Sequence, residues 1–340
     1  MEIGFFFWPF NVNLVKSLAI QGEQHAYDMI GVADTPGNAM DPWVSATLLA
    51  THTTRPRIGL CVTNLISRTP SVTAAAAASL ESVASKRTFV GIGAGHSGTH
   101  NIALHQKTTA QDLGAGVTFI RRLLNGEAAE VDGEAVRMPW IKQGPKVFVA
   151  ASHPKSLTQA GARADGVFIN YGLREENVRE SEGLVLQSMS AAGRSSDDVE
   201  LWQIAALDCN ENGDLAREKI GAMLAFNAGY VIGAKNVDKR GVPQDLIEPL
   251  LELRRRYSLR PGDADIRLVR ELGLYDYLAS RLSVCGTPDE RLAQVLAAQA
   301  AGVKRLMFSV SLAVDPVKTV DLFARRVLPA IRTTDAASSS

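Results

Sequence analysis

The sequence predicts an α/β protein, a (β/α)8 TIM barrel with a helical insertion before its eighth strand. Short apolar runs alternate along the chain with longer stretches that carry apolar residues at helical spacing. Eight such runs are found, and that number favours a closed parallel barrel over a doubly wound sheet, the runner-up. Residues 230–283 lack any strand pattern and mix helical stretches, so we expect them to form the insertion.

Each expected strand is an apolar run that stops at polar residues or glycine. The strands are expected at residues 2–8, 27–33, 58–62, 88–92, 146–150, 166–169, 201–206 and 305–310. Helices are expected at about 13–26, 45–53, 70–86, 109–124, 175–192, 214–229 and 317–331. Two further helices are expected to end at Ala164 and at Ala301. Asp132-Gly133 between alternating residues predicts a small hairpin over 130–136. The Thr287-Pro-x-Glu290 sequence predicts a capped helix start.

The length and composition of the chain indicate one large domain. We expect one barrel domain at 1–332, followed by a disordered tail at 333–340. The chain has 36 basic and 36 acidic residues, so no overall charge attracts nucleic acid or a membrane. No apolar stretch reaches the roughly 18 residues of a spanning helix, and three distant cysteines lack metal-ligand spacing. We therefore expect a cytoplasmic protein without a metal site.

The stretch from Arg57 to Gly98 holds the strongest functional pattern. Its two apolar runs flank a helix that begins near Pro70, and together they predict a βαβ unit with neighbouring parallel strands. In such units, the loops at the carboxyl ends of the strands carry the chemistry. We therefore expect the active site between residues 63–68 and residues 94–97.

The segment VTNLISRTPSVTAAAAASLESVASKRTFVGIGAG at 62–95 resembles the bacterial-luciferase-like superfamily. It is most similar to the branch of methylenetetrahydromethanopterin reductase, where T-N-x-x-[ST]-R-x-P and G-I-G-x-G-[DH] strand ends recur. The resemblance implies a (β/α)8 barrel that binds reduced FMN or a deazaflavin, coenzyme F420. It also implies a non-prolyl cis peptide at Cys61-Val62, with Thr63 and Asn64 directed at the pyrimidine edge of the ring. The alternative for Asn64 is capping of the turn that follows the strand.

Gly93, Gly95 and His96 follow the next strand. Because the two glycines have no side chains, they let a flat ring approach the backbone. Tight packing of the strands is an alternative explanation for both glycines. The glycines are weak evidence for the dinucleotide-binding fingerprint, because the final glycine of that motif is missing. His96 is a candidate general acid or ring contact. Relatives often carry Asp at this position.

Ala151, Ser152 and His153 precede a helix and form a candidate anion site, since hydroxyls and free N–H groups gather at a helix N-terminus. Ordinary N-capping by Ser152 is the alternative. The resemblance implies that this turn holds the cofactor phosphate. Asn170, which stops the sixth strand, is a further candidate for cofactor binding.

Asp34 ends the second strand and is either a pocket acid or a turn former before Pro36-Gly37. Thr35 stands where relatives often have His. Asn64, His96 and Asp34 are thus the candidate catalytic residues.

The resemblance leads us to favour an FMN-dependent two-component monooxygenase, supplied with reduced flavin by a separate reductase and acting on a small organic substrate. The alternative is a reductase or dehydrogenase that depends on coenzyme F420 and transfers hydride directly. A non-catalytic flavin-binding barrel is a further alternative. We also expect a homodimer, the commonest closed assembly.

Overall fold

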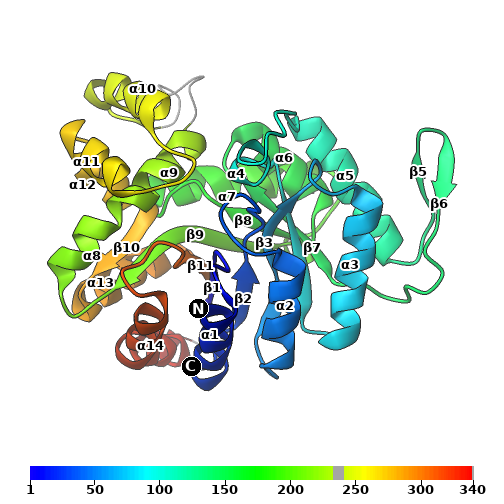
Figure 1. The fold of residues 1–340 in the computed structure, drawn as a ribbon, viewed down its shortest axis with the longest axis horizontal. Helices are drawn as coiled ribbons and strands as arrows, with labels where there is room; N and C mark the ends of the chain where they lie inside the picture. Colours follow the sequence, from blue (N-terminus) through cyan, green and yellow to red (C-terminus); the bar gives the residue numbers. More distant parts are fainter. Residues whose placement is uncertain (233–240, 339–340) are drawn as a thin grey trace. The chain divides into compact units, whose positions relative to one another are not determined.

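The computed structural model describes residues 1–232 and 241–338, and its strands form a parallel (β/α)8 barrel (Figure 1). The eight barrel strands are β1 (Glu2–Phe7), β2 (Met29–Val32), β3 (Arg57–Asn64), β4 (Thr88–Gly93), β7 (Lys146–Ala151), β8 (Gly166–Ile169), β9 (Glu200–Cys209) and β11 (Arg305–Ser309). They are hydrogen-bonded in the order β9-β11-β1-β2-β3-β4-β7-β8, and β8 pairs again with β9. This second pairing closes the sheet, so the predicted fold class is confirmed.

A ninth strand in this sheet was not expected from the sequence. Strand β10 (Ser283–Gly286) pairs in parallel with the carboxyl half of β9, where Ser283 lies opposite Ala206. It begins at Ser283, the last residue of the segment expected to be the helical insertion, and continues beyond that segment. The predicted hairpin is present as β5 (Ala129–Val131) and β6 (Glu134–Val136), and its turn residues Asp132 and Gly133 both have positive φ.

The chain separates into two compact units, which are described one at a time. Unit 1 comprises Met1–Phe5, Ile169–Glu182 and Trp202–Ser340, and unit 2 comprises Phe6–Phe168 and Gly183–Leu201. The expectation of one domain over 1–332 stays a proposal.

Unit 2 carries the helices that follow the first strands. They are α1 (Val12–Gln24), α2 (Pro42–Thr51), α3 (Pro70–Val83), α4 (Ser97–His100), α5 (Ala110–Leu124), α6 (Pro154–Arg163) and the 3-10 turn η1 (Ser196–Asp198). Proline occupies the first turn of α2, α3 and α6, where its missing N–H is not needed. Phe89, Phe148 and Phe168 pack against one another in the core, with ring centroids 4.9 to 5.8 Å apart.

Helix α7 (Glu175–Ala191) has residues in both units, and unit 1 carries the later helices. They are α8 (Gly213–Lys219), α9 (Gly221–Val231), the 3-10 turn η3 (Gln244–Leu246), α10 (Ile247–Arg256), α11 (Asp263–Glu271), α12 (Tyr275–Leu282), α13 (Pro288–Ala300), α14 (Pro316–Arg326) and α15 (Leu328–Ser338). Two expected helices are each divided in two, at Ile220 and at Val327. At the second break, Pro329 fits only the first turn of a new helix.

Where the structure describes it, the expected insertion consists mainly of helices joined by turns and irregular segments. It contains the end of α9, then η3 and α10 to α12, while residues 233–240 lie outside the described residues. The tail differs from expectation, because α15 continues to Ser338, and residues 339–340 lie outside the described part. None of the described helices is long and apolar enough to cross a membrane.

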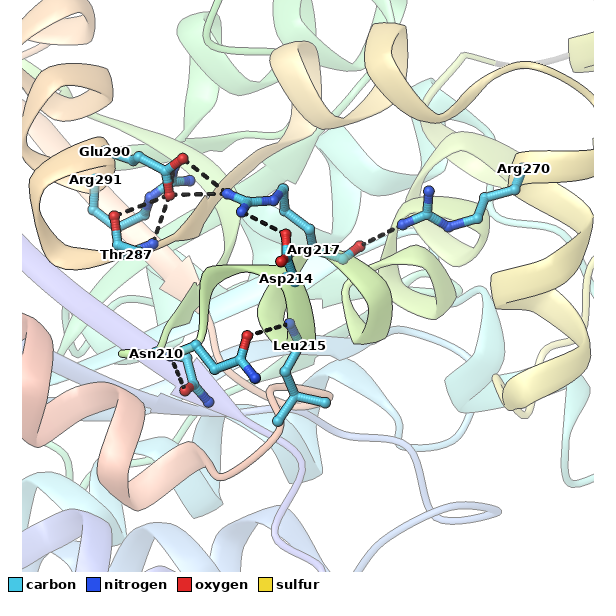
Figure 2. Close-up of polar contacts among 9 residues, drawn as sticks. Asn210, Asp214, Leu215, Arg217, Arg270, Thr287, Glu290 and Arg291 are labelled. Atoms are coloured by element: carbon cyan, nitrogen blue, oxygen red, sulfur yellow. Dashed lines mark hydrogen bonds and ion pairs between the residues drawn. The ribbon is translucent and has the colours of Figure 1, made fainter.

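The predicted start of α13 is confirmed in detail, and Figure 2 shows its polar contacts. Glu290 Oε2 accepts the backbone N–H of Thr287 at 2.7 Å and its hydroxyl at 3.0 Å. Arg217 of α8 donates to both carboxylate oxygens of Glu290, at 2.8 and 2.9 Å, and also to Asp214. These contacts tie α8 to the N-terminus of α13 within unit 1.

Candidate functional site

The candidate site of unit 2 is built around a buried carboxyl group, that of Asp34. This residue follows β2, whereas Thr63 lies near the end of β3, and the two strands are parallel neighbours. The Thr63 hydroxyl donates to Asp34 Oδ2 over 2.6 Å, and the backbone N–H of Asp34 donates to the Val62 carbonyl at 3.3 Å. Asp34 is 8% exposed and Thr63 is 1% exposed. The two strand ends therefore bring an acid and a hydroxyl together away from bulk water.

Burial raises the pKa of Asp34 above its ordinary value, although the hydrogen bond from Thr63 and the charge of Arg68 oppose the rise. The nearby charge of Asp41 adds to the increase. The turn after Asp34 is closed by backbone bonds from Asn38 and Ala39 to the Thr35 carbonyl. Because the Asp34 carboxyl bonds Thr63 and not this turn, the geometry favours a pocket acid over a turn former.

Asn64, the last residue of β3, organises the loop that follows. Its Oδ1 accepts the backbone N–H groups of Ile66 at 2.9 Å and Ser67 at 2.8 Å, and its Nδ2 donates to Ser67 Oγ at 2.9 Å. Asn64 therefore caps the turn that follows the strand, which was the alternative role expected for it. The resemblance also implied a cis peptide at Cys61–Val62, and this bond is cis. Burial raises the pKa of the Cys61 thiol well above its ordinary value.

The same loop holds an ion pair to which the sequence analysis assigned no role. Arg68 pairs with Asp41, which also caps α2 by accepting the N–H groups of Trp43 and Val44 at 2.9 and 3.1 Å. The signal was available, because Arg68 belongs to the quoted strand-end motif and Asp41 precedes a Pro at a helix start. What the sequence did not indicate was that these two side chains meet.

Glycines at and after the end of β4 allow close packing. A Cβ on Gly93 would lie 2.8 Å from a Val62 methyl group, and one on Gly95, whose φ is +75°, would crowd Thr99 and Asn64. One on Gly98 would lie 2.4 Å from the Asp34 carbonyl oxygen, so the absent side chain lets α4 approach the acid. These contacts support the tight-packing alternative that the sequence left open.

His96 is the N-cap residue of the short helix α4 and is half-buried. The next residue, Ser97, receives a hydrogen bond of 3.5 Å from the Thr35 hydroxyl, so α4 is linked to the strand end that carries Asp34. Thr35 and Ser97 are both buried, and their contact was not predicted from the sequence. The loop after β4 thus lies against the ends of β2 and β3, as expected for the candidate site.

The turn after β7 leads into α6, but its cap differs from expectation. His153, not Ser152, is the N-cap residue, and Ser156 Oγ accepts the His153 N–H at 3.2 Å while donating to the His153 carbonyl. The capping alternative for Ser152 is therefore wrong, because the cap falls one residue later. Ala151 is the last residue of β7, and the first turn of α6 contains no acidic side chain. Anion binding at this turn stays a prediction.

Asn170 follows β8 and belongs to unit 1, where it is 6% exposed. Its part in the site stays a prediction from the sequence. Among the residues that the structure describes, no group of three or more His, Cys, Asp or Glu side chains is placed to hold a metal ion.

The chain is similar to known proteins over most of its length. Residues 8–305 match the family described as luciferase-like monooxygenase. The chain is 24% identical over 319 residues to 5,10-methylenetetrahydromethanopterin reductase of Archaeoglobus fulgidus, covering 91% of this chain and 93% of that protein. It is 25% identical to the F420-dependent hydroxymycolic acid dehydrogenase of Mycobacterium tuberculosis, covering 88% and 77% of the two chains.

A solved structure, the coenzyme F420 dependent tetrahydromethanopterin reductase of Methanopyrus kandleri, has the same fold. Its TM-score is 0.78 at 21% identity, covering 97% of this chain and 99% of that one. The family match spans most of the chain and includes the strand ends that carry Asp34, Thr63 and His96. This chain therefore belongs to the luciferase-like monooxygenase family and is an enzyme of the oxidoreductase class.

Proposed function

We propose that this enzyme depends on coenzyme F420 and transfers hydride between the deazaflavin and a small organic substrate. The observation that carries the proposal is the match to the M. tuberculosis relative, described as F420-dependent, over 88% of this chain. From the sequence we favoured an FMN-dependent monooxygenase, with this function as the alternative. The monooxygenase is now the second candidate, and the description of the family supports it.

The residues present fit a cofactor with a polar ring edge and a phosphate. In unit 2, the indole Nε1 of Trp43 is buried and has no hydrogen-bond partner among the described residues, so it is a donor for an acceptor on a ligand. The first turn of α6 offers N–H groups and no acidic side chain, which suits a phosphate. Asp34 and Thr63 supply a carboxyl and a hydroxyl at the neighbouring strand ends.

When bound, the deazaflavin supplies or accepts the hydride. The chain's own contribution is to manage the proton that must accompany it. With its raised pKa, the buried Asp34 carboxyl holds a proton closer to neutral pH than an exposed aspartate does. The Thr63 hydroxyl fixes the orientation of that carboxyl, and Asn64 holds the loop beside it. Asp34 is thus the proton donor for reduction of the substrate and the proton acceptor in the reverse direction.

A titration of the purified protein with F420 and, separately, with FMN tests the proposal. We expect saturable binding of F420, followed by the change in its absorbance and fluorescence, and weaker binding of FMN. Reduction of bound F420, or its reoxidation by a substrate without oxygen, would establish hydride transfer. Tight binding of reduced FMN with oxygen consumption, and no binding of F420, would overturn the proposal in favour of the monooxygenase.

The turn before α6 allows a test of the phosphate site. Ser152→Asp places a negative charge beside the proposed phosphate, so we expect cofactor affinity to fall by about tenfold or more, because a charge in place of a donor opposes an anion. Ser152→Ala is the matched control and should change affinity less. Equal affinity of the Asp variant and the wild type in the same titration would place the phosphate elsewhere.

A further inference from the structure

Unit 2 contains a cavity at the end of its strands opposite to Asp34. Its volume is about 660 Å³, within the range of small-molecule sites. Arg57, Thr88 and Lys146, the first residues of β3, β4 and β7, line it together with the end of α3 and residues 140–145. The seven residue steps of β3 from Arg57 to Asn64 span roughly 23 Å at about 3.3 Å each. This cavity is therefore separate from the candidate catalytic site.

Basic side chains dominate the charge of this cavity. Arg57 and Lys146 share one carboxylate, that of Glu200, with each nitrogen 2.8 Å from a different oxygen. In the described part of the chain, neither Lys86 nor Lys142 forms an ion pair with a carboxylate. Glu81, also in the lining, accepts the Lys86 backbone N–H and the Thr88 hydroxyl.

The charge balance indicates the kind of ligand. Four basic side chains stand against the carboxylates of Glu81 and Glu200, which leaves two positive charges, four minus two. A phosphate monoester carries about −1.5 to −2 at neutral pH, which matches this excess. Lys86 and Lys142, whose ammonium groups the described carboxylates leave available, are the donors that such a phosphate would contact.

Trp140 supplies a second, independent feature. It lines the cavity and is 53% exposed, although the neighbouring Ile141 is buried. An indole ring that remains half open beside basic groups offers a face on which a planar ring stacks, and stacking of a base on an aromatic side chain contributes about 1–3 kcal/mol. A ligand that uses both features combines a planar aromatic ring with a phosphate.

We propose that this cavity binds a phosphorylated planar molecule of the nucleoside monophosphate type. Its phosphate contacts Lys86 and Lys142, and its ring stacks on Trp140. The site is independent of the catalytic proposal, because no residue of the catalytic site lines it.

Calorimetric titration of the full chain with AMP tests the proposal, with adenosine and inorganic phosphate as separate arms. We expect one-to-one binding of AMP with a dissociation constant below about 1 mM, and at least tenfold weaker binding of either fragment. Lys142→Ala and Trp140→Ala should each weaken AMP binding about tenfold. Lys16→Ala, which removes an exposed charge from α1 of the same unit, is the control and should leave binding unchanged.

Several outcomes would overturn the proposal. They are the absence of saturable AMP binding by the wild type, binding that survives both cavity substitutions, and equal affinity for phosphate and AMP. Because Lys142 and Trp140 are surface positions in an irregular segment, circular dichroism should show both variants folded as the wild type. Displacement of AMP by the catalytic cofactor would also contradict a separate site.

Discussion

At the scale of single residues, Asp34 is a buried acid whose surroundings differ from those of an ordinary surface aspartate. Its carboxyl is buried, bonded by Thr63 and close to the Arg68–Asp41 pair. The sequence could place Asp34 and Thr63 at neighbouring strand ends, because β2 and β3 follow each other in the chain. It could not decide whether the carboxyl turned towards Thr63 or closed its own turn, since that depends on side-chain torsions that the packing around them sets.

We predict that Asp34→Asn is more thermally stable than the wild type at neutral pH but far less active. The raised pKa means that the folded state favours protonated Asp34. Its stabilising contribution is therefore complete below the ordinary pKa of 3.8 and is lost as pH rises through the raised value. Asn is neutral at all pH values and keeps an oxygen for the Thr63 hydroxyl. Turnover should fall by about 100-fold or more if Asp34 moves the proton.

Thermal melts of both proteins from about pH 4 to about pH 8 would check the stability difference, which should grow with pH. Thr63→Val is the companion variant. It removes a hydrogen bond that lowers the Asp34 pKa, so the pH profile of the rate should shift upward. An Asp34→Asn enzyme with wild-type turnover would show that this carboxyl is not the proton donor.

At the scale of elements, the loop after β3 is held by one side chain. Asn64 closes it with two backbone N–H groups and the Ser67 hydroxyl. We predict that Asn64→Ala loses about 1 kcal/mol of unfolding free energy, the usual cost of a lost cap. Because this loop adjoins Thr63, the rate with bound cofactor should also fall by about 100-fold. Denaturant unfolding and single-turnover kinetics on one preparation would check both.

Ser67→Ala is the matched control, since it removes one bond of the turn and leaves both bonds to Asn64 Oδ1. It should cost less stability and little rate. If Asn64→Ala unfolds more easily but reacts normally, Asn64 is a structural cap and not part of the catalytic site.

A second prediction at this scale concerns the start of α13. Thr287→Ala should lower the free energy of unfolding by about 1 kcal/mol, because it removes the hydroxyl that Glu290 binds at the helix N-terminus. Glu290→Gln keeps an acceptor for the Thr287 N–H but loses the charge facing Arg217, and exposed ion pairs contribute little, about 0–1 kcal/mol. Urea titrations of both variants check this order, and a larger loss in Glu290→Gln would contradict it.

Elements with strong local signals were predictable, whereas those set by tertiary contacts were not. The Thr287 capping box and the Asp132-Gly133 turn are short-range patterns, and both are present. The break between α8 and α9 at Ile220 has no comparable signal. It lies where Gly221 begins α9 against Ile266 of α11, a contact between residues distant in sequence. Strand β10 likewise forms through pairing with Ala206–Cys209 of β9, residues distant from it in sequence.

At the scale of the whole molecule, the eightfold alternation of strands and helices predicted the barrel, and the closing pair β8–β9 confirms it. The cofactor and the reaction were harder to predict from the sequence. Similar strand ends occur with FMN and with the deazaflavin, and the residue pattern does not distinguish the two cofactors. The matched relatives, not the residues, moved the proposal towards F420. Phosphate binding at the turn before α6 and cofactor binding by Asn170 stay predictions, because both depend on a bound cofactor that no sequence pattern positions.

Assembly is the remaining question at this scale, and unit 2 offers a surface for it. Val12, Val44 and Val72 lie in the first turns of α1, α2 and α3, and all three side chains are exposed. Helix α2 packs against both α1 and α3, so these residues lie at the same end of three neighbouring helices. We infer that these three exposed apolar side chains belong to a surface that another chain covers.

We predict a homodimer that buries this surface through a twofold axis, the commonest closed arrangement. Light scattering of the wild type should give about twice the 36.5 kDa of one chain. The double variant Val44→Lys with Val72→Lys should return the mass of one chain, because two buried ammonium groups would oppose their symmetry mates across the interface. Val131→Lys is the control, since Val131 is also exposed but lies on the β5–β6 hairpin. A wild-type mass near 36.5 kDa would refute the dimer, and a double variant that stayed dimeric would place the interface on another face.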